Sequence, residues 1–339
     1  MNLNNKNFLI TGGTGSFGKK FIEIILKKFK PKKIIIFSRD EFKQQNLKIE
    51  LKNYSCMRYF IGDIRDLERL KFATQNVDIV IHAAALKNVP FAEYNPFEVV
   101  KTNIIGSQNV IDACIYNNVE KVIALSTDKA SSPVNLYGAT KLTSDKLFVS
   151  ANNYVNRNQK TRFAVVRYGN VFGSRGSIFE LIYNHKKNKF FNITDMSMTR
   201  FNITLEESVD FVLKSIQRMW GGEIFVPKIP SYKLLDVAEA LLSLIKIKII
   251  GLRPGEKIHE EMISENESSN ALEFKDYYVI IPFSEFLSWS KKDYMTKNSY
   301  AKPCAKNFCY KSNLNKDFLS IKEIIQVYKK NSPEISKIT

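Results

Sequence analysis

Residues 126–141 read STDKASSPVNLYGATK and bring together an aspartate, two lysines and a tyrosine. Tyr137 and Lys141 are four positions apart, so they share one face if this part of the chain is helical. An ammonium group beside a phenol favours the phenolate and lowers the pKa of the phenol towards that of a general base. Asp128 and Lys129 lie just upstream. A tyrosine and a lysine suffice to oxidise a single hydroxyl group, so the second pair needs a separate explanation.

A glycine pattern near the start of the chain predicts a dinucleotide-binding turn. Residues 11–18, TGGTGSFG, place Gly12, Gly15 and Gly18 between an apolar run and an amphipathic segment. Glycine allows the tight turn and the close approach of the backbone to a pyrophosphate, which then lies on the helix N-terminus. Its position after a first strand and before a first helix is typical of a nicotinamide dinucleotide site.

Residues after the next predicted strands complete this crevice. The second strand ends in Ser38-Arg39-Asp40, where the adenosine ribose is bound, and an arginine there suits the 2′-phosphate of NADP. Asp63 and Ile64 follow the third strand, and Ala83–Ala85 follow the fourth. We expect these residues to form the walls of the crevice beside the adenine and the nicotinamide.

The elements that must position these residues follow a regular alternation. Apolar, β-branched runs alternate with amphipathic segments, which predicts an α/β fold, a Rossmann-like, doubly wound parallel sheet covered by helices on both faces. Strands are expected at Phe8–Ile10, Ile34–Phe37, Met57–Ile61, Asp78–His82, Val122–Leu125 and Phe163–Arg167, and helices near 16–28, 41–51, 66–75, 96–117 and 135–152.

Beyond residue 170 the pattern changes to loops rich in Gly, Ser, Asn and Thr. Thr204-Leu-Glu-Glu207 is a capping box that predicts the start of an amphipathic helix. A short strand (Glu223–Val226) and another helix from about residue 232 follow. We therefore expect an NADP-binding Rossmann domain at residues 1–170 and a smaller, mainly substrate-binding lobe at 171–339, with some segments packing back on the first domain.

Composition limits the remaining classes of function. The formal net charge of +17 is spread in twos and threes among acidic residues, which predicts a lysine-rich surface and not a nucleic-acid interface. The four cysteines form no Cys-x-x-Cys pair and the three histidines lie far apart, so no metal site is expected. With no apolar run of membrane-spanning length and no signal peptide, the simplest expectation is a cytoplasmic protein without a membrane partner.

Motifs along most of the chain resemble one family. They are TGGTGSFG (11–18), SRDEFKQ (38–44), GDIRD (62–66), HAAALKNVPFAEYNP (82–96), STDKASSPVNLYGATKLTSDKLF (126–148), RYGNVFGSRGS (167–177), MTRF (198–201), GGEIFVPKIPS (221–231) and IIGLRPGEKIHE (249–260). The chain resembles the extended short-chain dehydrogenases/reductases and, among them, the inverting UDP-N-acetylglucosamine 4,6-dehydratases that begin pseudaminic acid synthesis for flagellin glycosylation. The family usually has histidine at the position of Asn88.

The resemblance implies a role for each residue of the first motif. Tyr137, supported by Lys141, would deprotonate the C4 hydroxyl of the sugar while hydride passes to tightly bound NADP. Lys129, in its neutral form, would take the C5 proton, and Asp128 would protonate the departing C6 hydroxyl. Hydride returned to C6 and a proton delivered to C5 from the opposite face would invert that centre and regenerate the cofactor.

The remaining site residues follow from the same resemblance. Five residues come from loops that face the crevice in such folds: Arg167, Asn170, Arg175, Arg200 and Arg253. Arginines there bind the diphosphate of the substrate, and Glu256 accepts hydrogen bonds from the ribose hydroxyls. The cofactor set is Gly12, Thr14, Gly15, Ser16, Phe17, Gly18, Ser38, Arg39, Asp40, Lys43, Asp63, Ile64, Ala83, Ala85, Lys87, Tyr137, Lys141 and Val171; the UDP-sugar set is Lys87, Thr127, Asp128, Tyr137, Asn170, Arg175, Arg200, Arg253 and Glu256.

Two alternatives remain open. A nucleotide-sugar 4-epimerase shares fold and cofactor but does not need the pair Asp128-Lys129. A catalytically silent NADP-sensing protein would be expected to lack Tyr137 or Lys141, and both are present. Helices near 96–117 and 135–152 are the usual dimer face of the superfamily, so a homo-oligomer, a dimer or a hexamer, is expected.

Overall fold

The computed structural model describes residues 2–156, 158–174, 177, 190–242, 246–283, 289–297 and 301–331. The main sheet is built from β1 (Asn7–Thr11), β2 (Lys33–Ser38), β3 (Met57–Ile61), β4 (Ile79–His82), β5 (Lys121–Thr127), β6 (Arg162–Tyr168), β10 (Ile224–Pro227), β14 (Ala271–Glu273), β15 (Tyr277–Ile280) and β16 (Lys302–Pro303). The smaller sheets contain β7 (Asn170–Phe172), β8 (Phe190–Ile193), β9 (Thr199–Thr204), β11 (Ser231–Lys233), β12 (Lys246–Ile249), β13 (Glu261–Ile263) and β17 (Tyr310–Lys311).

The helices are α1 (Ser16–Lys28), α2 (Glu41–Glu50), α3 (Leu67–Ala73), α4 (Val89–Tyr94), α5 (Pro96–Val100), α6 (Gly106–Tyr116), α7 (Leu136–Ser150), α9 (Leu205–Arg218), α10 (Leu234–Leu241), α11 (Glu265–Ser268), α12 (Lys291–Lys297) and α13 (Ile321–Asn331). A π-helical turn, η1 (Lys101–Ile105), joins α5 to α6, and short 3₁₀ turns occur at η2 (Asp128–Ala130) and η3 (Ala151–Asn153). Among the described residues, no helix combines the length and the apolar character that crossing a bilayer requires.

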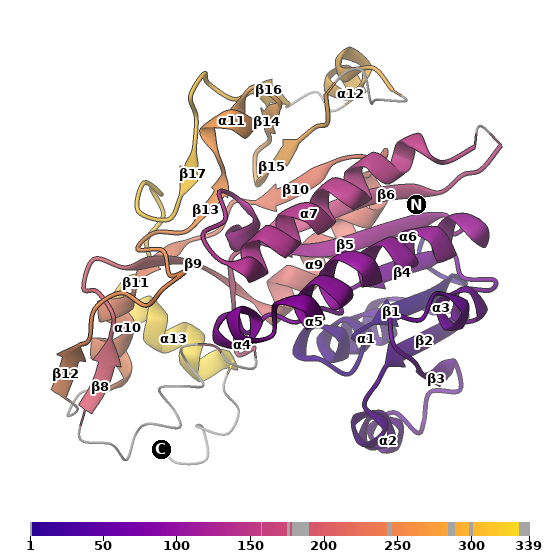
Figure 1. Cartoon of the computed structure of the whole chain (residues 1–339), viewed down its shortest axis with the longest axis horizontal. Coiled ribbons are helices and arrows are strands. Elements are labelled where there is room, and N and C mark those ends of the chain that lie inside the picture. Colours follow the sequence, from indigo (N-terminus) through magenta and orange to yellow (C-terminus); the bar gives the residue numbers. More distant parts are fainter. Residues whose placement is uncertain are drawn as a thin grey trace.

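The main sheet has the strand order of a dinucleotide-binding fold (Figure 1). Its order is β3-β2-β1-β4-β5-β6-β10, all parallel, followed by β15, β14 and β16 in antiparallel pairing. The order reverses between β1 and β4, and ligands of such sheets bind where their carboxyl ends diverge at this point. The predicted strands, the predicted fold class and the Thr204 capping box are confirmed.

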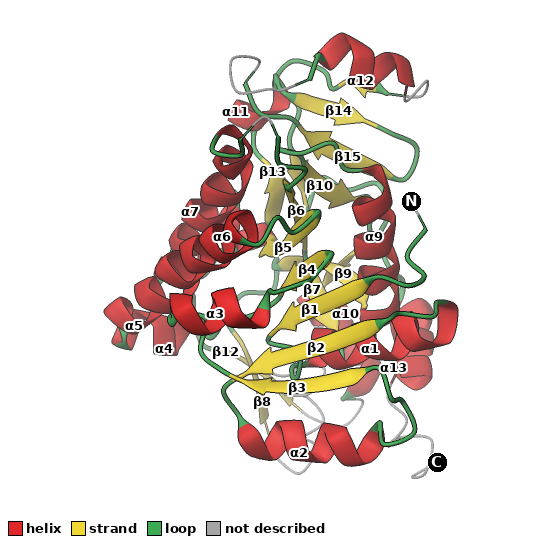
Figure 2. Cartoon of the chain, turned by 90° about the vertical axis from the view of Figure 1, so that its right-hand side faces the viewer, coloured by secondary structure: helices red, strands yellow, loops and turns green. Residues whose placement is uncertain are grey.

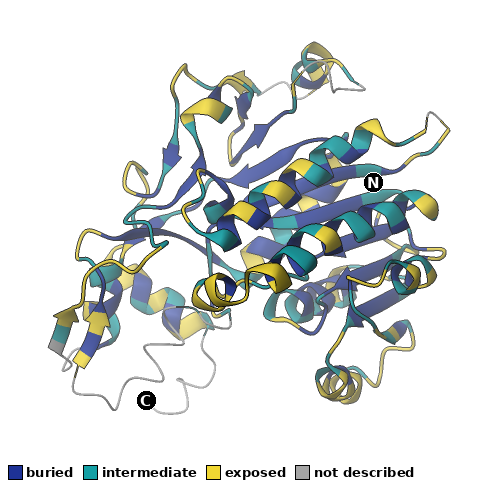
Figure 3. Cartoon of the chain, viewed as in Figure 1, coloured by how far each residue is buried: buried dark blue, intermediate teal, exposed yellow. Residues whose placement is uncertain are grey.

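Helices cover both faces of this sheet (Figure 2). Helices α3, α6 and α7 pack beside one another on one face, and α1 packs against α9 on the other. The parallel strands are buried almost throughout, as the dark central strands of Figure 3 show. Burial on both faces explains why their sequences read as continuous apolar runs and not as alternating ones.

A second, smaller core lies outside the main sheet. It joins β7 and β8 to β11, α10 and α13. Of these, β8, β11, α10 and α13 lie at the lower left of Figure 1. Strands β10, β14, β15 and β16, although late in the sequence, extend the first sheet. The domain boundary near residue 170, and the expectation that later segments pack back on the first domain, both stay predictions. The buried residues of the second core are Phe172, Phe191, Ile193, Tyr232, Val237, Ala238, Leu242, Ile324 and Tyr328.

The helix expected near 96–117 is interrupted by the π-helical turn η1. The extra residue in this turn directs Asn103 into the interior, where its side chain is 1% exposed. Asn103 Oδ1 accepts from the Leu86 backbone N–H over 2.8 Å, and Asn103 Nδ2 donates to the Leu86 carbonyl over 2.9 Å. The same amide donates to Thr140 Oγ1 over 3.1 Å. One side chain therefore fixes the loop after β4 against α7.

We predict that Asn103→Ala loosens this loop, because both backbone groups of Leu86 lose their partner. The free energy of unfolding should fall by about 1–3 kcal/mol. Urea unfolding followed by circular dichroism measures this loss. Gln108→Ala, which removes a contact with Asp112 on the surface of α6, is the control and should stay within about 0.5 kcal/mol of the wild type. Equal stability of the two variants would contradict the assignment.

Candidate active site

A cavity of about 1030 Å³ opens at the carboxyl ends of the parallel strands. Every residue assigned from sequence to the cofactor lines it, from Gly12 to Val171. Residues of the second lobe close the other side, including Arg200, Arg253 and Glu256. The cavity therefore joins the glycine-rich turn to the tyrosine, and both to the second lobe.

The glycine-rich turn is shaped to receive an anion. Gly12 has φ +65°, and a Cβ there would lie 2.9 Å from the Ala84 nitrogen. A Cβ on Gly18 would lie 2.6 Å from Gly13 Cα, so this glycine lets the helix pack against the turn. Gly15 precedes α1 and provides no side-chain cap, and the N-terminus of a helix is a favourable position for an anion. The turn fits a dinucleotide pyrophosphate.

Two basic residues, Arg39 and Lys43, line the adenosine end of the cavity. Arg39 is half exposed, with its guanidinium 3.7 Å from Asp63 Oδ2. Asp40 caps α2 by accepting from the Lys43 backbone N–H over 2.9 Å, and its carboxylate also contacts the Lys43 ammonium. Asp40 therefore holds the first turn of α2, while Arg39 lines the cavity with loosely paired N–H groups.

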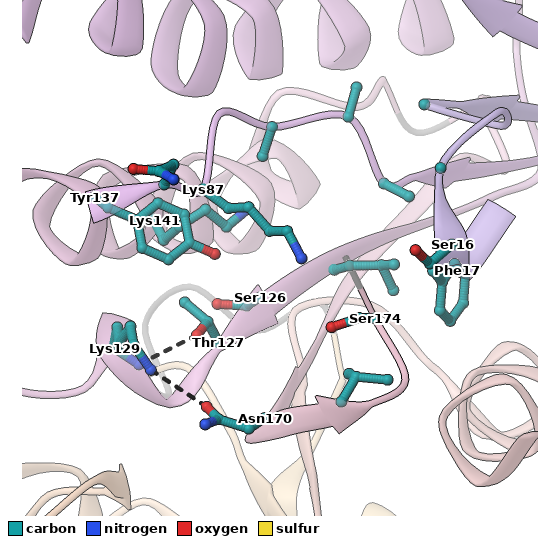
Figure 4. A pocket seen from close by; sticks show the side chains of 18 of the residues that line it. Ser16, Phe17, Lys87, Ser126, Thr127, Lys129, Tyr137, Lys141, Asn170 and Ser174 are labelled. Carbon is teal, nitrogen blue, oxygen red and sulfur yellow. Dashed lines mark hydrogen bonds between the residues drawn. The ribbon is translucent and has the colours of Figure 1, made fainter. Parts of the chain in front are cut away.

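Tyr137 and Lys141 lie on the inner face of α7, as the spacing predicts. Asn135 begins this helix by accepting from the Gly138 N–H over 2.8 Å, and it also donates to the Gly255 carbonyl in the second lobe. Figure 4 shows the tyrosine hydroxyl directed into the cavity, on the side where Ser126 and Thr127 lie. The helix cap and the second lobe together place the phenol in the cavity.

The sequence predicts a lowered pKa for Tyr137, and this expectation is wrong for the protein without a bound cofactor. Burial raises the pKa of Tyr137 to about 12, and the cation that acts in the opposite direction is Lys129. Lys141 is itself buried, and burial lowers its pKa against the opposing effect of Asp145. Among the charged groups of the protein, Lys129 therefore has the largest effect in lowering the pKa of Tyr137.

Lys129 lies between two buried carboxylates. Its Nζ is 3.1 Å from Asp128 Oδ1 and 2.9 Å from Glu260 Oε1. Asn170 Oδ1 lies 3.5 Å from the same nitrogen, as Figure 4 shows. Burial by itself lowers the pKa of Lys129, but Asp128 and Glu260 outweigh this effect and raise it. The neutral lysine that the resemblance requires is therefore not the resting form of this site.

Asp128 is fully buried, and the described residues that line the cavity do not include it. Its Oδ1 accepts from Thr127 Oγ1 over 3.0 Å as well as from Lys129. Burial raises the pKa of the Asp128 carboxyl, against the opposing effect of Lys129. Asp128 therefore contacts the amino group of Lys129 but does not itself line the cavity.

Comparison with known proteins places this arrangement in a family. A family model described as polysaccharide biosynthesis protein matches residues 8–282. The chain belongs to this family. The predicted membership of the extended short-chain dehydrogenases/reductases is confirmed with it.

Two curated relatives and one solved structure show how far the likeness extends. The chain is 54% identical to the UDP-N-acetylglucosamine 4,6-dehydratase (inverting) of Campylobacter jejuni subsp. jejuni serotype O:2, over 96% of this chain and 97% of the relative. It is 44% identical to a UDP-glucose 4-epimerase of Rickettsia bellii, over 84% of this chain and 86% of the relative. The X-ray structure of Pen from Bacillus thuringiensis matches with a TM-score of 0.87 at 40% identity, over 96% of this chain and 98% of that one.

The arginines that the family resemblance assigns to the substrate differ in where the structure places them. Arg200 lines the cavity, but its guanidinium donates to the carbonyls of Thr199, Ile258 and Lys257 over 2.8, 2.8 and 2.9 Å. Arg253 lines the cavity on an exposed loop. Arg175 lies outside the described residues.

Arg167 does not face the crevice, and the expectation that it does is wrong. Its side chain is fully buried and donates to Glu267 Oε1 over 3.0 Å, to the Met262 carbonyl over 2.9 Å and to Asp145 Oδ2 over 3.3 Å. Asp145 lies one helical turn after Lys141, where it also accepts from Ser126 Oγ over 2.8 Å. Arg167 therefore ties α7 to α11.

Asn88, which stands where the family usually has histidine, has a structural role. Its Oδ1 accepts from the Phe91 N–H over 3.1 Å and so begins α4, and the residue also lines the cavity. Asparagine is among the best residues at this position of a helix. The departure from the family pattern thus preserves the turn that follows Lys87.

Sequence reasoning missed two charged residues of the site, Lys257 and Glu260. Both line the cavity, and Lys257 Nζ donates to the Ser131 carbonyl over 2.6 Å. Both belong to the quoted stretch IIGLRPGEKIHE, in which only the arginine and the first glutamate were given roles. The signal was therefore present, but contact between residues more than a hundred positions apart cannot be read from spacing.

We predict that Arg167→Met lowers the free energy of unfolding by about 3–5 kcal/mol, because the buried carboxylate of Asp145 and the partly buried carboxylate of Glu267 lose their cation. Protonating those carboxyl groups removes the unpaired charge, so the deficit should shrink as the pH is lowered. Chemical unfolding of wild type and variant across a pH series measures both effects. Arg58→Met, on the exposed face of β3, is the matched control. A deficit that grows at low pH would contradict the role of Arg167.

Proposed function

We propose that this chain is an NADP-dependent, inverting UDP-N-acetylglucosamine 4,6-dehydratase. The observation that carries the proposal is that the phenol of Tyr137 and the amino group of Lys129 line one cavity with the glycine-rich turn. A reaction that oxidises one carbon and then removes a proton from its neighbour needs two such groups on one sugar. The 54% identity to a protein of that name, over nearly the full length of both chains, supports the same activity.

The residues of the glycine-rich turn and of β2 fit the proposed cofactor. Gly12, Gly15 and the N-terminus of α1 would hold the pyrophosphate, and Arg39 would pair with the 2′-phosphate. Lys141, on the same helix face as the tyrosine, would hold the nicotinamide ribose. When bound, the nicotinamide supplies reversible removal of hydride from C4 of the sugar.

The chain's own residues then move the protons. Tyr137 takes the proton of the C4 hydroxyl while hydride leaves C4, and the resulting C4 ketone makes the C5 proton acidic. Lys129 removes the C5 proton, and the C6 hydroxyl leaves as water once it is protonated. Return of the hydride to C6 and of a proton to C5 on the opposite face then gives the inverted, L-configured product. Arg253 and Glu256 on the rim suit the nucleotide end of the substrate.

A nucleotide-sugar 4-epimerase is the second candidate, because a UDP-glucose 4-epimerase is among the relatives. An epimerase removes and returns hydride at C4 only, so it has no use for a base beside C5. The Lys129 amino group in the cavity favours the dehydratase, as does the greater identity to the dehydratase of Campylobacter jejuni.

The wider setting belongs to the same proposal. A 6-deoxy-4-keto sugar nucleotide is a precursor for surface glycans, and the family description names polysaccharide biosynthesis. We place the enzyme in the cytoplasm, where UDP-sugars are made, at the start of pseudaminic acid synthesis for flagellin or of a related glycan. The exposed Phe91, Tyr94 and Phe97 on α4 and α5 suit association into a homo-oligomer.

We predict that turnover of UDP-N-acetylglucosamine in D₂O gives a 4-ketone product lighter by one water. Deuterium should enter C5, because solvent supplies the new proton there, and C6 should receive the unlabelled hydride that left C4. Mass spectrometry and proton NMR of one reaction measure both positions. Tyr137→Phe is the control and should bind the substrate without forming product. An isomer of unchanged mass without label at C5 would instead identify an epimerase.

We predict that Arg39→Ala weakens binding of NADP⁺ about 10- to 100-fold and changes binding of NAD⁺ little, because the lost interaction is with the 2′-phosphate. Titration calorimetry with each cofactor measures the two changes. Arg58→Ala, outside the cavity, should leave both affinities unaltered. Equal weakening of both cofactors would remove Arg39 from the choice between them.

A further inference from the structure

Lys129 faces a difficulty that its surroundings create. Two carboxylates within 3.1 Å hold it as an ammonium ion, yet only the neutral amine can accept the C5 proton. The proton that Lys129 gives up needs a nearby acceptor, and that acceptor must be able to return it within the same turnover. The site offers two candidates, Asp128 and Glu260.

Asp128 is poorly placed to deliver a proton to the sugar. Its carboxyl group is fully buried and lies outside the cavity lining of the described chain. Its Oδ1 accepts from both Thr127 and Lys129. A sugar hydroxyl that occupied the cavity would meet Lys129 before it met this carboxyl group.

Glu260 is placed differently. It lines the cavity although its side chain is only 3% exposed, and its Oε1 accepts from Lys129 Nζ over 2.9 Å. Its Oε2 is buried without a hydrogen-bond partner among the described residues. The backbone N–H of Glu260 donates to Ser312 Oγ over 2.9 Å, and Arg200 Nε lies 3.7 Å from Oε1. Glu260 is thus fixed on its backbone side. Asp128 Oδ2 is likewise buried without a partner among the described residues, so what distinguishes Glu260 is that it lines the cavity.

We propose that Glu260 is the acid that protonates the departing C6 hydroxyl and exchanges its proton with Lys129. This inference rests on the proposed dehydratase function and deepens it. Before elimination, Lys129 transfers a proton to Glu260, which turns the ion pair into an amine and a carboxylic acid.

The elimination then restores the starting pair. The Lys129 amine takes the C5 proton, the electrons of the C5–H bond form the C5–C6 double bond, and the C6–O bond breaks. Glu260 gives its proton to the leaving oxygen, so one water departs. Lys129 is again an ammonium ion and Glu260 a carboxylate, and no outside acid or base is consumed. Exclusion of water by the bound sugar favours the uncharged pair over the ion pair.

The test is the variant Glu260→Gln, which keeps an oxygen for Lys129 but cannot carry the proton. The full-length enzyme loaded with NADP⁺ is mixed with UDP-N-acetylglucosamine in D₂O, in single-turnover experiments. Absorbance of the reduced nicotinamide should still show C4 oxidation, while water loss falls about 100-fold or more. Glu261→Gln is the matched control, because this buried neighbour bonds Ser132 Oγ over 2.6 Å and lies outside the lining of the cavity.

The pH profile separates a proton carrier from a structural residue. In the wild type the proton moves within the pair, so water loss should be independent of pH across the neutral range. In Glu260→Gln, Lys129 must lose its proton to solvent, so residual C5 exchange should rise with pH. A variant that was merely misfolded would lose C4 oxidation as well.

Three results would overturn the inference. Water loss in Glu260→Gln at the rate of the wild type would remove Glu260 from the reaction. If Glu260→Gln eliminated water normally and Asp128→Asn did not, Asp128 would be the acid that protonates the C6 hydroxyl. An unchanged pH profile in Glu260→Gln would reduce the residue to a structural role. If the wild-type enzyme formed no dehydrated product, that result would contradict the proposed function itself and not the role of Glu260.

Discussion

The site depends on contact between the turn that follows β5 and residues 253–261 of the second lobe. Lys257 donates to the Ser131 carbonyl across this contact, and Lys129 pairs with Glu260. The turn carries the lysine at its start and leads into the helix of the tyrosine at its end. The second lobe therefore does more than close the cavity, because its contacts with Lys129 and with Asn135 at the start of α7 help to set the distance between Lys129 and Tyr137.

The same contact brings four ionised groups together in a place with little water. Two carboxylates, Asp128 and Glu260, lie beside two cations, Lys129 and Arg200. Burying any one of these charges by itself would be strongly unfavourable, so the cluster holds together as a neutral set. Such a set is already oriented before a substrate arrives, and a single proton shift within it changes the charge beside the sugar.

In the proposed reaction, this arrangement would also order the two chemical steps. Burial raises the pKa of Tyr137 to about 12, and the charged Lys129 acts to lower it. While Lys129 is an ammonium ion, the tyrosine is the better base, which suits oxidation at C4. Once Lys129 has given up its proton, it becomes a base itself and no longer favours the phenolate. The two bases are thus unable to act at full strength together, and oxidation precedes elimination.

The order of strands and helices was readable from the sequence, because local patterns encode it. Apolar runs mark buried parallel strands, the spacing of Tyr137 and Lys141 marks a helix face, and Gly12 marks a turn that a side chain would block. Each of these signals lies within a few residues. The cavity lining expected for the cofactor followed from the same rules, because every parallel strand ends at one edge of the sheet.

The tertiary structure alone decided the charge at the site. Arg167 read as a ligand of the crevice, yet it is buried between Asp145 and Glu267. The sequence suggested an acid, Asp128, and a neutral base, Lys129. In the structure Lys129 also forms an ion pair with Glu260, which is more than a hundred residues away in the chain. A pKa depends on every charge nearby and on the loss of water around it, and both are properties of the folded chain and not of residue spacing.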